Sequence, residues 1–264
     1  MDDNKQILFI MMVIQNSLNI STRLEDVSRE LWQFIGSYES CINDPGKCKH
    51  IHQKLSHFNQ THSDNSDHIY DVIQGLSKGF YLIKSGLEWQ EPAVGHSLVD
   101  KPNDTHKARG IQWRLVMTWG GFETITKTLL LKKSNGGLKT ENIKSFTVKC
   151  DLPNNYNSLN PPDSTRVNLE RWLNKNPSIQ GKSALADFLS LGNGDQEIIE
   201  HWIVKSQPVS TWVEAVRLAK ALRNATAHGA LSASKVKEWG LQKPLLTLSD
   251  NLAEIVVAGM QKLI

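Results

Sequence analysis

The residues best suited to do chemistry lie together in the last quarter of the sequence. Arg223-Asn-Ala-Thr-Ala-His228 brings a guanidinium, an amide and an imidazole into one short segment. Arginine can grip a phosphate with two parallel hydrogen bonds, and histidine can take up or give a proton near neutral pH. The residue types therefore indicate chemistry on a phosphate ester. Arg223 and Asn224 would hold phosphoryl oxygens, or Asn224 would orient the imidazole, and His228 would transfer the proton.

One long helix is expected to carry this segment, from a cap at Ser210 or Thr211 to about residue 228. Small and apolar residues at helical spacing predict its buried side: Ala215, Leu218, Leu222 and Ala225. Another side carries polar and basic residues: Arg217, Lys220, Asn224 and His228, with Arg223 alongside. Gly229 is suited to end the helix because glycine tolerates the left-handed conformation.

Such a row of cations repels itself unless negative charge lies opposite, and two sources of that charge stay open. RNA phosphate is one. The other is structural: Arg217 would pair with Glu214 or with an acid on another helix, and His228 would be favoured by the dipole at the helix C-terminus. The spacing alone favours the structural interpretation.

Charge is unevenly distributed along the chain, although the total is only +3. Residues 1–100 and 151–200 carry net charges of −5 and −3, whereas residues 101–150 and 201–264 carry +7 and +4. This pattern indicates either a surface that faces a polyanion or an ordinary solvated face. We predict RNA contacts at four cations: Arg217, Lys220, Lys235 and Lys237. Trp239 is either a core residue or a platform on which a base stacks.

The segment Arg223–His228 resembles the signature of HEPN domains, which is an Arg, a polar residue that is often Asn, three free positions and a His. Its place near the end of a helix that is followed by another helix also resembles the group. So do the segment Trp119-Gly-Gly-Phe122-Glu123 and the Leu-rich final helix. The resemblance covers roughly residues 67–264, but its specific motif spans only 223–228. Gly229-Ala230 follows, where some toxin members have a tyrosine.

The resemblance implies an all-α fold: a HEPN-like helical bundle (67–264) with an N-terminal helical extension and polar connector (1–66). It also implies a homodimer whose signature helices face one another, and a metal-independent endoribonuclease without cofactors. Arg223, Asn224 and His228 would be its catalytic residues. Such domains often serve in defence or as toxins, with a neutralising or activating partner protein. The alternatives are a non-catalytic module that binds RNA or protein, and a structural protein whose function lies in the N-terminal region.

Apolar periodicity predicts helices over about 4–40, 67–90, 106–133, 165–175, 183–191, 195–205, 210–228 and 245–263. Ser145–Cys150 is the one strand candidate. Asn43-Asp44-Pro45-Gly46 ends the first helix, and a polar connector with a short helix is expected over 43–67.

Residues 41–68 are rich in histidine and contain side chains that can bind zinc. Cys41, Cys48, His50 and His52 are possible ligands, but their spacing fits no standard finger, so a polar segment without metal is expected. Three cysteines are too few for a disulfide framework. The apolar run Ile7–Ile14 is too short to cross a bilayer, and the acidic start is unlike a signal peptide. We therefore expect a cytoplasmic protein that is not in a membrane.

Overall fold

The protein is all-α in the computed structural model, as predicted. The structure describes residues 18–33, 43–89, 103–132, 135–175, 185 and 188–264. No strand occurs in these ranges, where the only β pairing is an isolated antiparallel bridge between Leu159 and Val209. None of the described helices is both long and apolar enough to cross a membrane.

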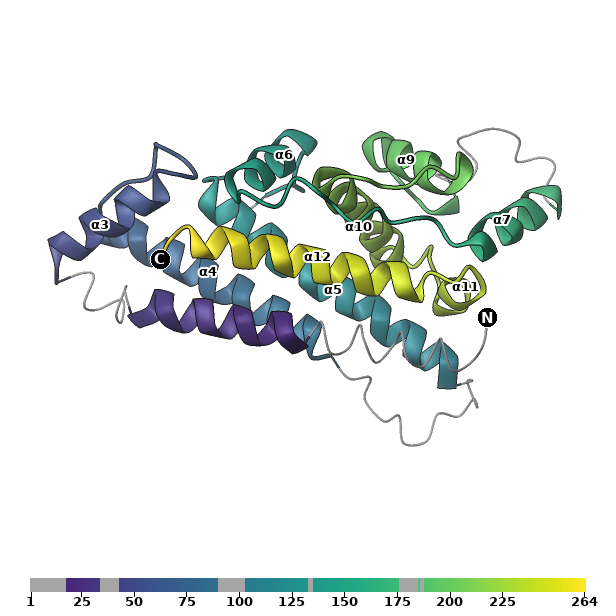
Figure 1. Ribbon diagram of the computed structural model, residues 1–264, viewed down its shortest axis with the longest axis horizontal. Coiled ribbons are helices and arrows are strands. Elements are labelled where there is room, and N and C mark those ends of the chain that lie inside the picture. Colours follow the sequence, from purple (N-terminus) through teal and green to yellow (C-terminus); the bar gives the residue numbers. More distant parts are fainter. Residues whose placement is uncertain (1–17, 34–42, 90–102, 133–134, 176–184, 186–187) are drawn as a thin grey trace. The chain divides into compact units, whose positions relative to one another are not determined.

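Figure 1 shows the helices with colours that follow the sequence. An unlabelled helix covers residues 18–33. The labelled elements are α3 (Pro45–Leu55), α4 (Ser66–Leu87), α5 (Asn103–Leu129), α6 (Thr140–Lys149), α7 (Asp163–Lys175), α9 (Asn193–Ile199), the π-helix η1 (Glu200–Val204), α10 (Trp212–Ala227), α11 (Ala233–Glu238) and α12 (Gln242–Gln261). Most agree with the predicted ranges to within a few residues. The outer parts of the predicted first helix and four of the nine residues of the predicted helix at 183–191 lie outside the described residues.

The predicted strand Ser145–Cys150 is wrong, because the segment belongs to α6. Ile143, Phe146 and Thr147 are its buried residues, at the three- and four-residue spacing of a helix face. β-Branched side chains in a short run do not distinguish a strand from a buried helix turn, and here the packing decided.

The chain divides into two compact units. The first contains Trp89–Val116 and Asn155–Asn251, and the second contains Met11–Glu88, Met117–Asn154 and Leu252–Ile264. α3 and α4 both belong to the second unit. The predicted division of the chain after residue 66 stays a prediction.

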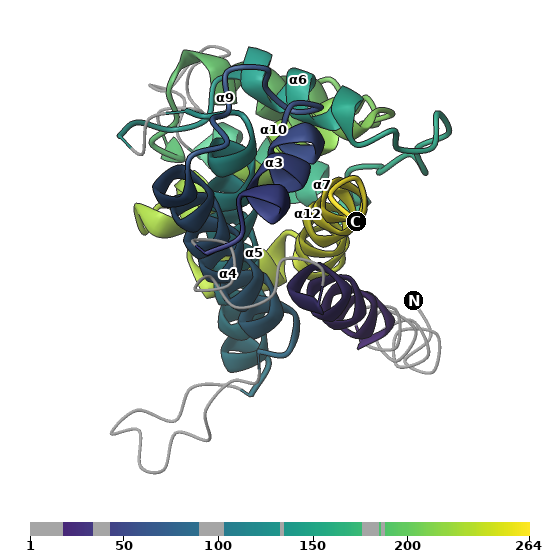
Figure 2. The same cartoon turned by 90° about the vertical axis from the view of Figure 1, so that its left-hand side faces the viewer.

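In the second unit, α4 crosses the adjoining part of α5 at two glycines. A Cβ at Gly121 would lie 2.5 Å from the carbonyl oxygen of Gly79, and a Cβ at Gly79 would lie 2.3 Å from Cγ1 of Ile125. The glycines cost helix propensity but permit this close approach. The helix at 18–33 runs beside the C-terminal part of α12, where Arg23 and Glu254 form an ion pair of 2.7 Å (Figures 1 and 2).

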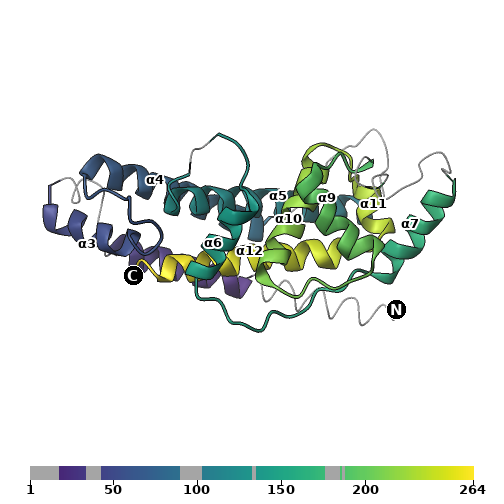
Figure 3. The same cartoon turned by 90° about the horizontal axis from the view of Figure 1, so that it is seen from above.

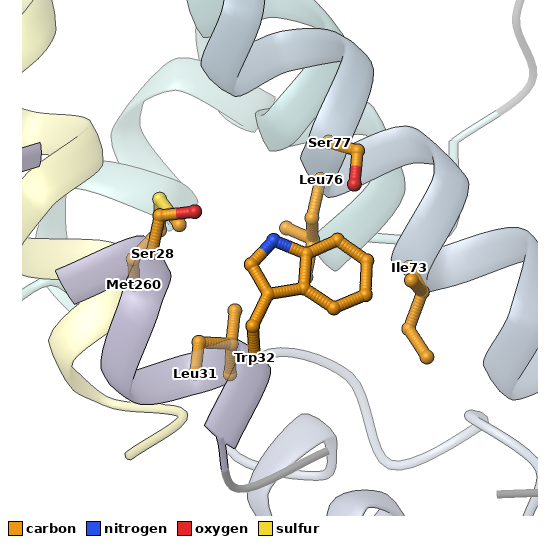
Figure 4. Close-up of a pocket in the computed structure, with 7 residues that line it drawn as sticks. All are labelled: Ser28, Leu31, Trp32, Ile73, Leu76, Ser77 and Met260. Carbon is orange, nitrogen blue, oxygen red and sulfur yellow. The ribbon is translucent and has the colours of Figure 1, made fainter. Parts of the chain in front are cut away.

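A small apolar hollow lies on the second unit between the helix at 18–33, α4 and the end of α12 (Figure 4). Its lining consists of Ser28, Leu31, Trp32, Ile73, Leu76, Ser77 and Met260. None of these side chains is an acid or a base, so the hollow offers no group for proton transfer.

A buried histidine of the connector, His62, contacts the half-buried His68 in the first turn of α4. His62 is 4% exposed, its Nε2 lies 2.9 Å from the carbonyl oxygen of Leu129, and its Nδ1 lies 2.9 Å from Nε2 of His68. The carbonyl can only accept, so neutral His62 is protonated on Nε2 and accepts the His68 proton on Nδ1. Across the described residues, no cluster of three or more His, Cys, Asp or Glu side chains is arranged to hold a metal ion; Cys41 lies outside them.

Acidification is expected to destabilise the fold through this pair. Burial lowers the pKa of His62 and of His68, so their neutral forms are favoured in the folded state. A histidine with a depressed folded pKa binds fewer protons than its unfolded form, and stability is therefore lost as pH falls below about 6.5. Denaturant unfolding at pH 7.5 and 5.5 should show a smaller pH difference for His62→Gln than for the wild type. The exposed-histidine control, His50→Gln, should keep the wild-type difference. Equal pH differences in all three proteins would contradict the expectation.

Candidate functional site

The helix that carries the signature, α10, begins with a complete set of capping hydrogen bonds. Thr211 is the N-cap, and its Oγ1 accepts a hydrogen bond of 3.2 Å from the backbone N–H of Glu214. The Glu214 carboxylate accepts in return from the backbone N–H of Thr211, which completes a capping box. Glu214 is thus used for capping, and it is not the partner of Arg217.

The buried side of α10 is the predicted one. Ala215, Leu218, Leu222 and Ala225 are each at most 1% exposed. Burial of this side fixes the rotation of the helix, and the polar side with the signature residues therefore faces outward from the core.

The C-terminal end of α10 presents His228. This residue is the C-cap, its backbone N–H donates to the carbonyl of Asn224, and Gly229 follows in the left-handed conformation with φ of +74°, as predicted. The His228 side chain is exposed, and among the described residues its imidazole has no hydrogen-bond partner. An imidazole in this position is accessible to a substrate.

Helix α9 lies beside α10 and supplies two carboxylates to its basic side (Figure 3). Glu197 pairs with Arg217 at 2.5 Å, and Asp195 pairs with Lys220 at 3.1 Å. The negative charge opposite Arg217 and Lys220 therefore comes from carboxylates of another helix, which is one of the two sources expected from the sequence.

Asp195 also begins a chain of hydrogen bonds that reaches the signature arginine. Its Oδ2 accepts a bond of 2.7 Å from Nδ2 of Asn224, and Oδ1 of Asn224 accepts a bond of 2.9 Å from Arg223. A carboxylate accepts and a guanidinium donates, so both ends define the orientation of the Asn224 amide. Asn224 therefore holds Arg223, and its carbonyl oxygen is turned toward that guanidinium.

Arg223 differs from the other cations of α10. In the described part of the chain no carboxylate lies within ion-pair distance of it. Its Nε is buried without a hydrogen-bond partner, as is the Nε of Arg217. A buried N–H without a partner costs roughly 1–3 kcal/mol. The arrangement keeps the positive charge of Arg223 uncompensated, at a cost in stability.

The remaining predicted RNA contacts lie on α11. Lys237 pairs with Asp104 at 3.0 Å, and Lys235 lies 3.8 Å from Glu238 and over the ring of Trp239. Like Arg217 and Lys220, both lysines have a carboxylate close by, and an RNA phosphate would compete with it. RNA binding by these four cations stays a prediction. Trp239 is 0% exposed, so it is a core residue, and base stacking on it is excluded.

Sequence reasoning missed Asp195 and Glu197. Both lie in a predicted helix of the acidic segment 151–200, but nothing in their spacing showed that this helix packs against α10. The signature residues Arg223, Asn224 and His228 lie on one helix as predicted, and the structure links the first two directly.

Comparisons with protein-family models, with curated proteins and with solved structures find no match to the chain.

Proposed function

We propose that the protein is a metal-independent endoribonuclease of the HEPN type, active as a homodimer. The observation that carries the proposal is the difference between Arg223 and the two ion-paired cations of α10. Arg217 and Lys220 are neutralised by carboxylates of α9, whereas Arg223 is oriented by an amide and keeps its charge, five residues before an exposed histidine. An uncompensated guanidinium near an accessible imidazole suits the charge and proton transfer of phosphoryl chemistry.

In the proposed reaction the ribose 2′-oxygen attacks the adjacent phosphorus. The 2′-O–P bond forms and the P–5′-O bond breaks, which leaves a 2′,3′-cyclic phosphate and a 5′-hydroxyl. The 2′-hydroxyl loses its proton as it attacks, and the leaving 5′-oxygen gains one. His228 transfers the proton at one of these two oxygens, and Arg223 stabilises the negative charge that develops on the phosphoryl oxygens.

A second copy of the chain is part of the proposal. Residues five apart on a straight helix point about 140° from each other. One α10 therefore does not direct Arg223 and His228 to a single point, and a two-fold partner would complete the site from both sides. RNA is the proposed substrate, and defence or toxin activity under a neutralising or activating partner is the proposed setting.

The test uses the chemistry of the 2′-hydroxyl. Purified protein is incubated with mixed RNA in excess chelator, a cut site is mapped, and an oligonucleotide with one 2′-deoxy nucleotide on the 5′ side of that site is compared with the all-RNA form. We expect cleavage of the all-RNA form only, with 2′,3′-cyclic phosphate ends detected by mass spectrometry. Cleavage of the 2′-deoxy site, or activity that the chelator removes, would contradict the mechanism.

A further inference from the structure

We infer that Asp195 is a positioning residue for the site, acting on Arg223 through Asn224; the inference rests on the proposed function. Asp195 comes from α9, 28 positions before the signature arginine, and lies outside the signature itself. Its side chain contacts two residues on the polar side of α10, Lys220 and Asn224.

The two carboxylate oxygens of Asp195 have separate uses. Oδ1 lies 3.1 Å from Nζ of Lys220, and Oδ2 accepts the 2.7 Å hydrogen bond from Asn224. The side chain is only 12% exposed, so water competes little for either bond. A carboxylate held in this way gives Asn224 one amide orientation, with its carbonyl oxygen turned to the guanidinium of Arg223.

The Asn224 amide between Asp195 and Arg223 can orient the guanidinium without neutralising it. A carboxylate in direct contact with Arg223 would orient it but would also neutralise it, as Glu197 does for Arg217. Asn224 transmits the orientation without bringing a negative charge onto Arg223, and the guanidinium stays available to a phosphate. The alternative role for Asp195 is a shield that competes with RNA for Lys220, and it predicts the opposite change in activity when Asp195 is removed.

The experiment is a double-mutant cycle on kcat and KM with a cleavable RNA, using Asp195→Ala, Asn224→Ala and the double variant. Misplacement of a transition-state contact lowers kcat by up to about 100-fold. We expect Asp195→Ala to lower kcat roughly 10- to 100-fold with little change in KM. In the Asn224→Ala background, the loss of Asp195 should add less than about 2-fold, because a residue that acts through Asn224 has nothing left to act on. Asp195→Asn keeps an acceptor for Asn224 and should recover part of the loss.

The control on the same helix is Glu197→Gln, which removes the exposed partner of Arg217 and should leave kcat unchanged. Thermal unfolding midpoints identify variants that fail to fold; if Asp195→Ala is one, the cycle is run with Asp195→Leu, which also lacks an acceptor for Asn224. Higher activity on loss of Asp195, independent losses in the cycle, or wild-type kcat in Asp195→Ala would each overturn the positioning role and leave the nuclease proposal intact. A wild-type protein that cuts no RNA would reject both.

Discussion

Replacing His228 with alanine is expected to abolish RNA cleavage and to leave RNA affinity within a few-fold of the wild type. Proton transfer by a positioned side chain contributes about 10²- to 10⁴-fold to a rate. The His228 imidazole is exposed at the end of α10 and takes part in no hydrogen bond among the described residues, so its removal breaks no described hydrogen bond. Gel-based cleavage and a binding titration on the same RNA measure the two effects separately.

The matched control for this variant is His201→Ala. His201 is half-buried in η1, in the same compact unit, and has no place in the proposed site. The His201→Ala variant should cleave RNA at the wild-type rate. If His228→Ala also cleaves normally, the nuclease assignment to this residue is wrong. If RNA binds but neither wild type nor variant cleaves, a non-catalytic binding module becomes the better account.

Replacing Asp250 with alanine is expected to lower the free energy of unfolding by about 3–5 kcal/mol, the usual cost of removing one member of a buried ion pair. Asp250 and Arg114 form an ion pair of 2.5 Å in the first unit, and each side chain is only 8% exposed. Burial lowers the pKa of the Arg114 guanidinium, and the adjacent Asp250 carboxylate opposes that shift by stabilising the charged form. Denaturant unfolding monitored by tryptophan fluorescence gives the free energy directly.

Two further variants separate charge from packing at this pair. The double variant Arg114→Met/Asp250→Leu removes both charges and should lose much less than Asp250→Ala, since an apolar pair of similar volume needs no counter-charge. Asp26→Ala breaks the exposed pair with Arg29, whose side chains are 52% and 64% exposed, and should cost about 1 kcal/mol or less. Equal losses from Asp250→Ala and Asp26→Ala would show that burial of the Arg114–Asp250 pair adds nothing.

Local sequence patterns were sufficient to predict most of the helices and the orientation of α10. A helix is made of short-range hydrogen bonds, and its buried face repeats every three or four residues, so both are visible in a single stretch of sequence. Ala215, Leu218, Leu222 and Ala225 are buried as their spacing indicated, and Gly229 ends the helix in the left-handed conformation. The same reasoning failed at α6, where a short run of residues fits a strand and a helix equally well.

Helical periodicity was enough to predict which residues share one side of α10 and that Arg223, Asn224 and His228 lie near its end. Which cations of α10 have a carboxylate partner depends on the packing of α9 against it. Asp195 and Glu197 reach Lys220 and Arg217 from another helix, and Asn224 holds Arg223 in place of an acid. The physical reason is that ion pairs between helices depend on which faces pack together, and that choice depends on the whole core rather than on the spacing within either helix.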